Sequence, residues 1–135
     1  MAKTIQFDLV TPEKRLISET VDEVIAPGAG GDFGVLPGHT PFLSTLRIGE
    51  LQYRMGERWK SFSVSWGYAE VGPDRITVLA ELAEAAGEID VARAEEAAKR
   101  AEKEIAAAED KSAEMKAARD NLEKALLRIR VGKKG

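Results

Sequence analysis

Asp90 and Arg93 are one candidate pair for ligand chemistry. They are three residues apart, so a helix places both side chains on one face. One interpretation is an N-capping aspartate beside an ordinary surface charge. The other adds Arg100 and Arg128, because arginine suits phosphate and two helices folded into a hairpin could bring these side chains to one anion. The sequence leaves both interpretations open.

A glycine-rich stretch at residues 28–34 superficially resembles a phosphate-binding loop. Phe33 stands where the dinucleotide fingerprint requires glycine, and no Gly-Lys-Ser/Thr ending follows. A phosphate loop opens a helix, whereas this stretch leads into Val35-Leu36-Pro37-Gly38. We therefore expect a structural loop.

His39 is the single histidine, and the chain has no cysteine. A lone histidine without cysteines or clustered carboxylates is a poor metal ligand. No Ser–His–Asp set or carboxylate pair follows from the spacing, so we predict no catalytic and no metal-binding residue. His39 follows Pro37-Gly38, which predicts an exposed loop position suited to surface contact.

Charge and hydropathy exclude several classes of protein. The formal charge of −3 argues against a nucleic-acid binder. The start of the chain has no apolar signal-peptide core, and no apolar run reaches the roughly 20 residues of a membrane span. We expect a soluble chain that reaches a membrane only through a partner.

The elements that position these residues change character at Gly87. All 5 prolines and all the aromatic residues lie before Gly87, among short apolar runs separated by turn residues. These features predict an antiparallel β-sandwich or flattened barrel over residues 1–87. The expected strand runs are residues 4–10, 16–17, 21–26, 46–53, 59–62, 64–71 and 76–79.

Residues 88–135 are predicted to be helical. Alanine, Glu, Lys and Arg dominate there, and no Gly or Pro occurs from Glu88 to Val131. Two apolar stripes follow helical spacing: Ala94, Ala97, Ala98, Ala101, Ile105 and Ala108, then Met115, Ala118, Leu122, Ala125, Leu126 and Ile129. Residues 109–112 are the weak break between them, so one continuous helix of about 66 Å and a two-helix hairpin remain alternatives.

Residues 31–41 resemble the signature loop of the epsilon-subunit family of bacterial and chloroplast F-type ATP synthases. Residues 10–12, 67–71, 77–80 and 89–94 resemble the same family in the same order. The resemblance implies an α+β fold: an N-terminal sandwich of about ten strands and a C-terminal two-helix hairpin that can extend. It also implies a non-catalytic rotor subunit of the central stalk, which couples proton flow to ATP synthesis and whose helices inhibit ATP hydrolysis.

The implied partners are the gamma subunit, the c-subunit ring and, when the helices extend, the alpha/beta catalytic head. The implied location is the cytoplasmic face of the bacterial inner membrane. Asp32 and His39 match the ring-facing loop of the family. No cofactor is required, although some relatives bind regulatory ATP; the matching positions are Glu84, Ile89, Asp90, Arg93, Ala94, Arg100, Lys124 and Arg128.

Lys124 departs from the family pattern, because tight ATP-binding relatives carry arginine there. Lysine keeps the charge but loses the planar guanidinium fork. Two other functions stay open: a free-standing nucleotide-sensing module and a helical-hairpin adaptor outside the synthase.

Overall fold

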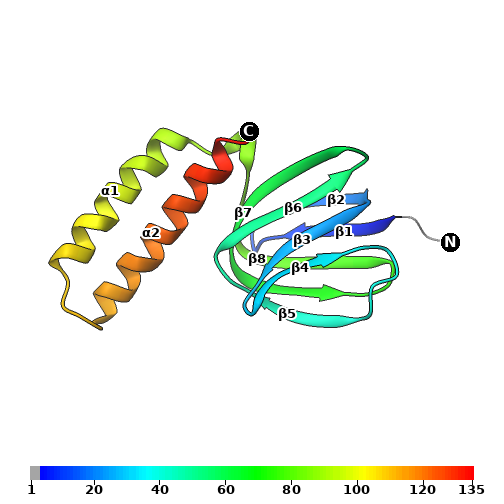
Figure 1. The fold of residues 1–135 in the computed structure, drawn as a ribbon, viewed down its shortest axis with the longest axis horizontal. Helices are drawn as coiled ribbons and strands as arrows, with labels where there is room; N and C mark the ends of the chain where they lie inside the picture. Colours follow the sequence, from blue (N-terminus) through cyan, green and yellow to red (C-terminus); the bar gives the residue numbers. More distant parts are fainter. Residues whose placement is uncertain (1–3) are drawn as a thin grey trace. The chain divides into compact units, whose positions relative to one another are not determined.

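The computed structural model describes residues 4–135. The first three residues lie outside it, and they are part of the start of the chain that was predicted to have no signal-peptide core. Two compact units divide between Glu84 and Ala85. The first is built of β-strands and the second of helices (Figure 1). In the described chain no helix is both long enough and apolar enough to cross a membrane.

The β-unit contains eight strands in one continuous hydrogen-bonded system. They are β1 (Ile5–Val10), β2 (Arg15–Val21), β3 (Glu23–Gly28), β4 (Gly31–Val35), β5 (Phe42–Leu46), β6 (Gly49–Met55), β7 (Arg58–Val71) and β8 (Arg75–Ala85). The order is β2-β1-β8-β7-β5-β3-β4, and β6 pairs with both β3 and β7. Because β7, β5, β3 and β6 pair in a ring, the sandwich is a flattened barrel, as the sequence predicted.

Strand β7 accounts for part of the difference between the eight strands of the structure and the roughly ten that the resemblance implied. Its first part pairs with β6 and its second part with β5, so one strand serves two sides of the barrel. The change of partner falls at Trp66 (φ 49°) and Gly67 (φ 138°). A Cβ at Gly67 would overlap the carbonyl oxygen of Leu79, so only glycine fits at this bend. The two runs predicted at residues 59–62 and 64–71 are therefore one bent strand.

Three other predictions for the β-unit need correction. The run at residues 46–53 is split, because the chain turns at Arg47 and Ile48 between β5 and β6. The glycine-rich stretch is structural but is a hairpin, with Ala29 and Gly30 as the turn between β3 and β4. Finally, β1 and β8 pair in parallel, although the pairs β1–β2, β3–β4, β3–β6, β5–β7 and β6–β7 are antiparallel. The strands between β1 and β8 supply the long connection that a parallel pair requires.

The core of the sandwich is formed by alternate strand residues that point inward. Phe7 and Tyr53 are fully buried with ring centroids 5.2 Å apart, and Phe62 lies 6.2 Å beyond Tyr53. Ile5, Leu9, Leu51, Ile76 and Val78 complete this interior. Because this core lies within the β-unit, we expect the unit to fold without the helices.

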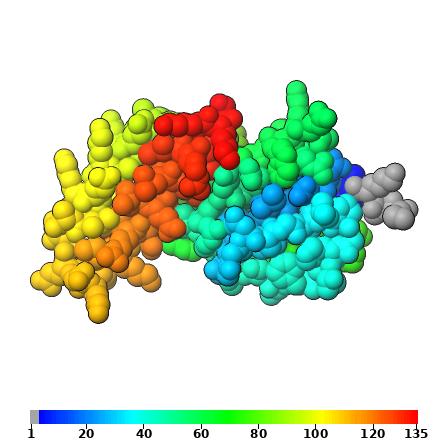
Figure 2. Space-filling view, in the orientation of Figure 1, coloured from blue at the N-terminus to red at the C-terminus, as the bar shows by residue number. Residues whose placement is uncertain are grey.

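The helical unit is a hairpin. A 3₁₀ turn, η1 (Ala86–Glu88), leads into α1 (Val91–Ala107), and α2 (Ala113–Gly132) follows. Figure 2 shows the orange and red atoms of α2 lying directly against the yellow atoms of α1. Ala94, Ala98 and Ala101 are buried, as the first stripe predicted, and their small side chains let the helices approach closely.

The break between the helices lies where the sequence placed it. Glu109 to Ser112 form a β-turn in which the amide of Ser112 donates to the carbonyl of Glu109 at 3.2 Å, and Lys111 has φ 61°. Ser112 Oγ accepts from the amide of Met115 at 3.0 Å and caps α2. The structure therefore contains the hairpin rather than the continuous helix.

The second stripe was partly wrong. Met115, Ala118 and Ala125 are buried, but Leu126 is 49% exposed and its neighbour Leu127 is buried instead. Leu127 and Val131 are four residues apart and form a second buried line along α2. Two adjacent leucines cannot both lie on one helical face, and the stripe selected the wrong one.

Candidate functional site

The start of α1 carries the candidate ligand motif. Asp90 is the N-cap: its backbone is extended, and its Oδ1 accepts a hydrogen bond from the amide of Arg93 at 3.1 Å. A cap of this kind is worth about 1 kcal/mol to the helix. Arg93 is exposed, so its guanidinium is available to solvent while its amide serves the cap. The capping interpretation of Asp90 is thus confirmed, and the ligand interpretation stays a prediction.

The remaining predicted nucleotide residues divide between the two units. Ile89, Asp90, Arg93, Ala94 and Arg100 lie in or just before α1, and Lys124 and Arg128 lie in α2. Arg93 and Arg100 are seven residues apart and exposed, so they share one side of α1. Lys124 and Arg128 are four residues apart, half-buried, and each already has an interaction partner. Glu84 also has a partner and lies in β8, in the other unit.

The hairpin therefore supplies two cationic pairs, one on each helix. Ile89 and Ala94 are buried, which suits a packing role rather than direct polar contact. What the arrangement can do chemically is attract an anion. Among the described residues, no group of His, Cys, Asp and Glu side chains has the makings of a metal site.

His39 lies in the loop after β4 and belongs to an aromatic cluster. Its ring centroid is 5.5 Å from that of Phe42, and Phe42 packs edge-on against Phe33 at 4.9 Å. The Nδ1 of His39 is 2.6 Å from the carbonyl oxygen of Thr40. His39 is half-buried, so the prediction that it is exposed was wrong: Phe42 covers one side of the ring.

Asp32 lies in a different local environment from His39. Its carboxylate forms an ion pair with Arg47, and its neighbour Phe33 points to the opposite face of β4. Asp32 and its partner Arg47 are both substantially exposed. The two predicted ring-facing residues therefore present a paired charge on one side of the β3–β4 hairpin and an aromatic cluster on the other.

Large apolar side chains are exposed close to this loop. Leu36 is 53% exposed and Leu43 is 66% exposed. Leu43 lies opposite Glu70, and Thr45 lies opposite the exposed Tyr68, so Leu43 and Tyr68 share the outer face of the β5–β7 pair. Exposed apolar groups gathered on one face are typical of a protein–protein interface.

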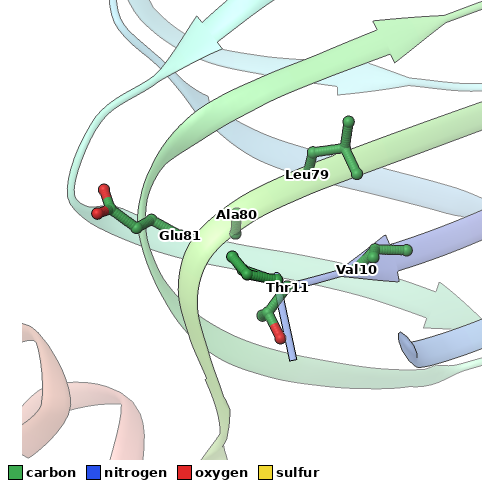
Figure 3. A pocket seen from close by; sticks show the side chains of 6 residues that line it. Val10, Thr11, Leu79, Ala80 and Glu81 are labelled. Carbon is green, nitrogen blue, oxygen red and sulfur yellow. The ribbon is translucent and has the colours of Figure 1, made fainter. Parts of the chain in front are cut away.

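A shallow pocket lies elsewhere on the sandwich, where β1 ends beside β8. Figure 3 shows Val10 and Thr11 at the end of β1 beside Leu79, Ala80 and Glu81 of β8. Pro12 completes a lining that is almost wholly apolar around about 360 Å³. This lining suits an apolar side chain of a partner better than a charged small molecule.

Several residues with a structural consequence were missed by the sequence analysis. Glu19 points into the sandwich, and its Oε2 is buried without a hydrogen-bond partner. The sequence analysis assigned no role to Gly132, which is the last residue of α2 and packs against Ile89 and Val91. The signal for Gly132 was a glycine directly after 44 residues without one.

Comparison with known proteins agrees with both units. Residues 4–86 match the family described as ATP synthase, Delta/Epsilon chain, beta-sandwich domain. Residues 88–133 match ATP synthase, Delta/Epsilon chain, long alpha-helix domain. The chain is 50% identical over 134 residues to the ATP synthase epsilon chain of Syntrophobacter fumaroxidans, covering 99% of each chain. It is 48% identical over 134 residues to that of Geobacter metallireducens, covering 99% of this chain and 97% of the relative.

Solved structures share the fold. A chain in the mitochondrial ATP synthase of Euglena gracilis (OSCP/F1/c-ring) aligns with a TM-score of 0.83 at 22% identity, covering 93% of this chain and 79% of that one. A chain in the central stalk/c-ring structure from Tetrahymena thermophila aligns with a TM-score of 0.67 at 17% identity, covering 95% and 96%. The matches in sequence favour a synthase subunit over the free-standing nucleotide sensor and the hairpin adaptor. The chain belongs to the ATP synthase delta/epsilon family and to its epsilon chains, which are non-catalytic stalk subunits of that complex.

Proposed function

We propose that the sandwich fixes this subunit in the rotor by binding the gamma subunit and resting on the c-subunit ring. The observation that carries the proposal is the exposed apolar surface of an otherwise well-packed sandwich, including Leu36 and Leu43. The aromatic cluster of Phe33, His39 and Phe42 stiffens the loop beside this surface. The complex lies on the cytoplasmic face of the bacterial membrane, and protons drive its ring.

The test of this part is assembly. Leu43→Asp places a charge on the apolar surface, while Glu57→Asp alters the exposed tip of the β6–β7 hairpin and serves as control. Each variant is mixed with gamma subunit and c-ring, and the recovered complex is quantified. Loss of epsilon from the complex with Leu43→Asp alone supports the surface, whereas equal recovery refutes it.

The helical unit is proposed to regulate ATP hydrolysis. A short turn without glycine or proline joins the two helices. The C-terminal end of α2 and the residues after it are basic through Arg128, Arg130, Lys133 and Lys134. An extended helix would carry these charges to acidic surfaces of the alpha/beta head, where electrostatic complementarity favours binding. Replacing Arg130, Lys133 and Lys134 with glutamine should relieve inhibition of hydrolysis in the assembled complex; unchanged inhibition would exclude this role.

ATP is the proposed regulatory ligand of the folded hairpin. The support is the pair of exposed arginines on α1, Arg93 and Arg100, and the pair Lys124 and Arg128 on α2. Lys124 is a point charge without the planar fork of arginine, so we expect weak affinity that rises with Lys124→Arg. Calorimetric titration measures this directly. Absence of heat at millimolar ATP for both the natural chain and Lys124→Arg would leave Asp90 and Arg93 as structural residues.

A further inference from the structure

The end of α2 packs against the segment that begins α1. A Cβ placed on Gly132 would lie 2.7 Å from Cγ2 of Val91, 3.0 Å from Cγ2 of Ile89 and 3.3 Å from Cβ of Ile89. These separations are shorter than an ordinary contact between carbon atoms, so only glycine fits without movement. In Figure 1 the red end of α2 meets the yellow-green segment that precedes α1. We call Ile89, Val91 and Gly132 the clasp.

The clasp is stiff on the side that faces Gly132. Ile89 and Val91 are both β-branched, so the Cγ2 atoms are bonded directly to Cβ and have little rotational freedom. Ile89 is also buried, with 9% of its surface exposed. Glycine is a poor helix former, yet it occupies the last position of α2. Glycine at this position lowers the helix propensity of α2 but allows its close approach to Ile89 and Val91.

A second contact supports the clasp one turn further on. The chain continues past Gly132 with hydrogen bonds from the amides of Lys134 and Gly135 to Val131 and Gly132, at 3.0 and 3.2 Å. A Cβ on Gly135 would lie 2.6 Å from the carbonyl carbon of Ala86. The end of α2 thus meets the 3₁₀ turn as well as the start of α1, and the contact is more than a single pair of atoms.

This contact exists only while the helices are folded back. In a continuous helix, Gly132 would lie about 60 Å from Val91 at ~1.5 Å per residue. An interaction that is present in one arrangement and absent from the other shifts the balance between them. Asp90, the cap of α1, lies between the two side chains of the clasp. A ligand that binds Asp90 or Arg93 would act on the same short segment.

We propose that the clasp of Ile89, Val91 and Gly132 acts as a latch, which holds the hairpin closed and sets how readily the helices extend. The proposal rests on the regulatory role proposed above for the helices. Its residue-level content is independent of that role: Gly132 is required for the docking of α2 onto Ile89 and Val91, and any larger side chain there loosens the end of α2.

Paired spin labels test the latch in the full chain. Because the chain has no cysteine, Glu96→Cys and Glu123→Cys provide two unique labels on exposed positions of α1 and α2. The labels lie close together in the hairpin and about 40 Å apart in a continuous helix at ~1.5 Å per residue. Pulsed electron paramagnetic resonance gives the populations with the short and the long distance between the labels. Amide hydrogen exchange reports whether the end of α2 is docked.

Gly132→Val is expected to raise exchange at the end of α2 by roughly tenfold or more, since overpacking of a tight contact has effects of that size. It should also increase the long-distance population. Gly34→Val is the matched control, because a Cβ on Gly34 meets nothing within 4 Å and Gly34 lies in β4, outside the helical unit. Val91→Ala removes Cγ2, the atom nearest to a Cβ on Gly132, so combining it with Gly132→Ala should recover part of the protection lost in Gly132→Ala alone.

The outcomes separate the latch from the regulatory proposal. Faster exchange with Gly132→Val, a normal Gly34→Val and partial rescue by Val91→Ala support the latch, whether or not a long distance appears. If no variant and no partner complex ever shows the long distance, the extension proposed above is refuted while the latch stands. If Gly132→Val exchanges like Gly34→Val, the latch is overturned.

Discussion

Replacing Glu19 with methionine should stabilise the β-unit. Glu19 lies on β2 opposite Phe7, and its Oε2 is buried with no hydrogen-bond partner. An unsatisfied buried polar group costs about 1–3 kcal/mol. Because the residue as a whole is only half-buried, we expect the lower end, a gain of about 1 kcal/mol in the free energy of unfolding. For a domain of this size, 1 kcal/mol raises the melting temperature by about 4–8 °C.

Tyr53 provides an independent readout of the same carboxylate. Burial of Tyr53 raises the pKa of its phenol above the ordinary value of 10.0, and the negative charge of Glu19 raises it further. The folded protein then holds the phenolic proton more tightly than the unfolded chain. The contribution of Tyr53 to the free energy of unfolding is therefore fully present below about pH 10 and is lost as the pH rises through the folded-state pKa. Glu19→Met removes the second cause, so the alkaline loss should become smaller.

Tyrosinate absorbance and denaturant unfolding measure both effects. The chain has 2 tyrosines, and the exposed Tyr68 can be changed to phenylalanine so that Tyr53 titrates alone. Glu57→Met makes the same chemical change at an exposed turn and should alter stability by less than about 0.5 kcal/mol. The reasoning is refuted if Glu19→Met lowers the free energy of unfolding, or if Tyr53 titrates at the same pH with and without Glu19.

Three further changes test other parts of the structure. Gly67→Ala should strongly destabilise the sandwich, because the new Cβ meets the carbonyl of Leu79 at a φ of 138°; thermal unfolding against the open position Gly30→Ala measures it, and equal melting would contradict the packing. Truncation after Gly87 should leave a folded β-unit with its own core, and a circular dichroism spectrum without β-structure would show otherwise. Ser112→Ala removes the cap of α2 and about 1 kcal/mol, so amides at the start of α2 should exchange roughly fivefold faster, whereas exchange unchanged from the natural chain would mean that the cap contributes nothing.

The sequence predicted the two modules well because each has a strong local signal. Alternating apolar residues around turn sequences mark the strands, and a long stretch of helix formers without glycine or proline marks the helices. The cap at Asp90 was also predictable, since a capping residue acts on an amide only three positions away. The inward direction of Glu19 was harder to see, because a charged residue on an edge strand normally points to solvent.

Non-local contacts account for the features that were missed. The bend in β7 depends on how closely Gly67 approaches β8, and the parallel pairing of β1 with β8 joins the two ends of the unit. The choice of Leu127 over Leu126 likewise depends on what packs around α2, because both positions have the same propensity. The position of Gly132 against Ile89 exists only after the helices have folded back on each other.

Local terms at the turn between the helices do not by themselves favour the hairpin. The cap at Ser112 contributes about 1 kcal/mol. Lys111 lies in the left-handed region, which costs a residue with a Cβ about 1–2 kcal/mol. These two terms nearly cancel, so the hairpin must be held by packing. The packed side chains are the buried alanines of α1, the larger buried residues Met115, Leu127 and Val131 of α2, and the contact at Gly132. Alanines bury little area each, so the larger residues of α2 supply most of the apolar area that is buried. For the regulation proposed above, a partner must bind the extended form more tightly than the folded form by more than this packing energy.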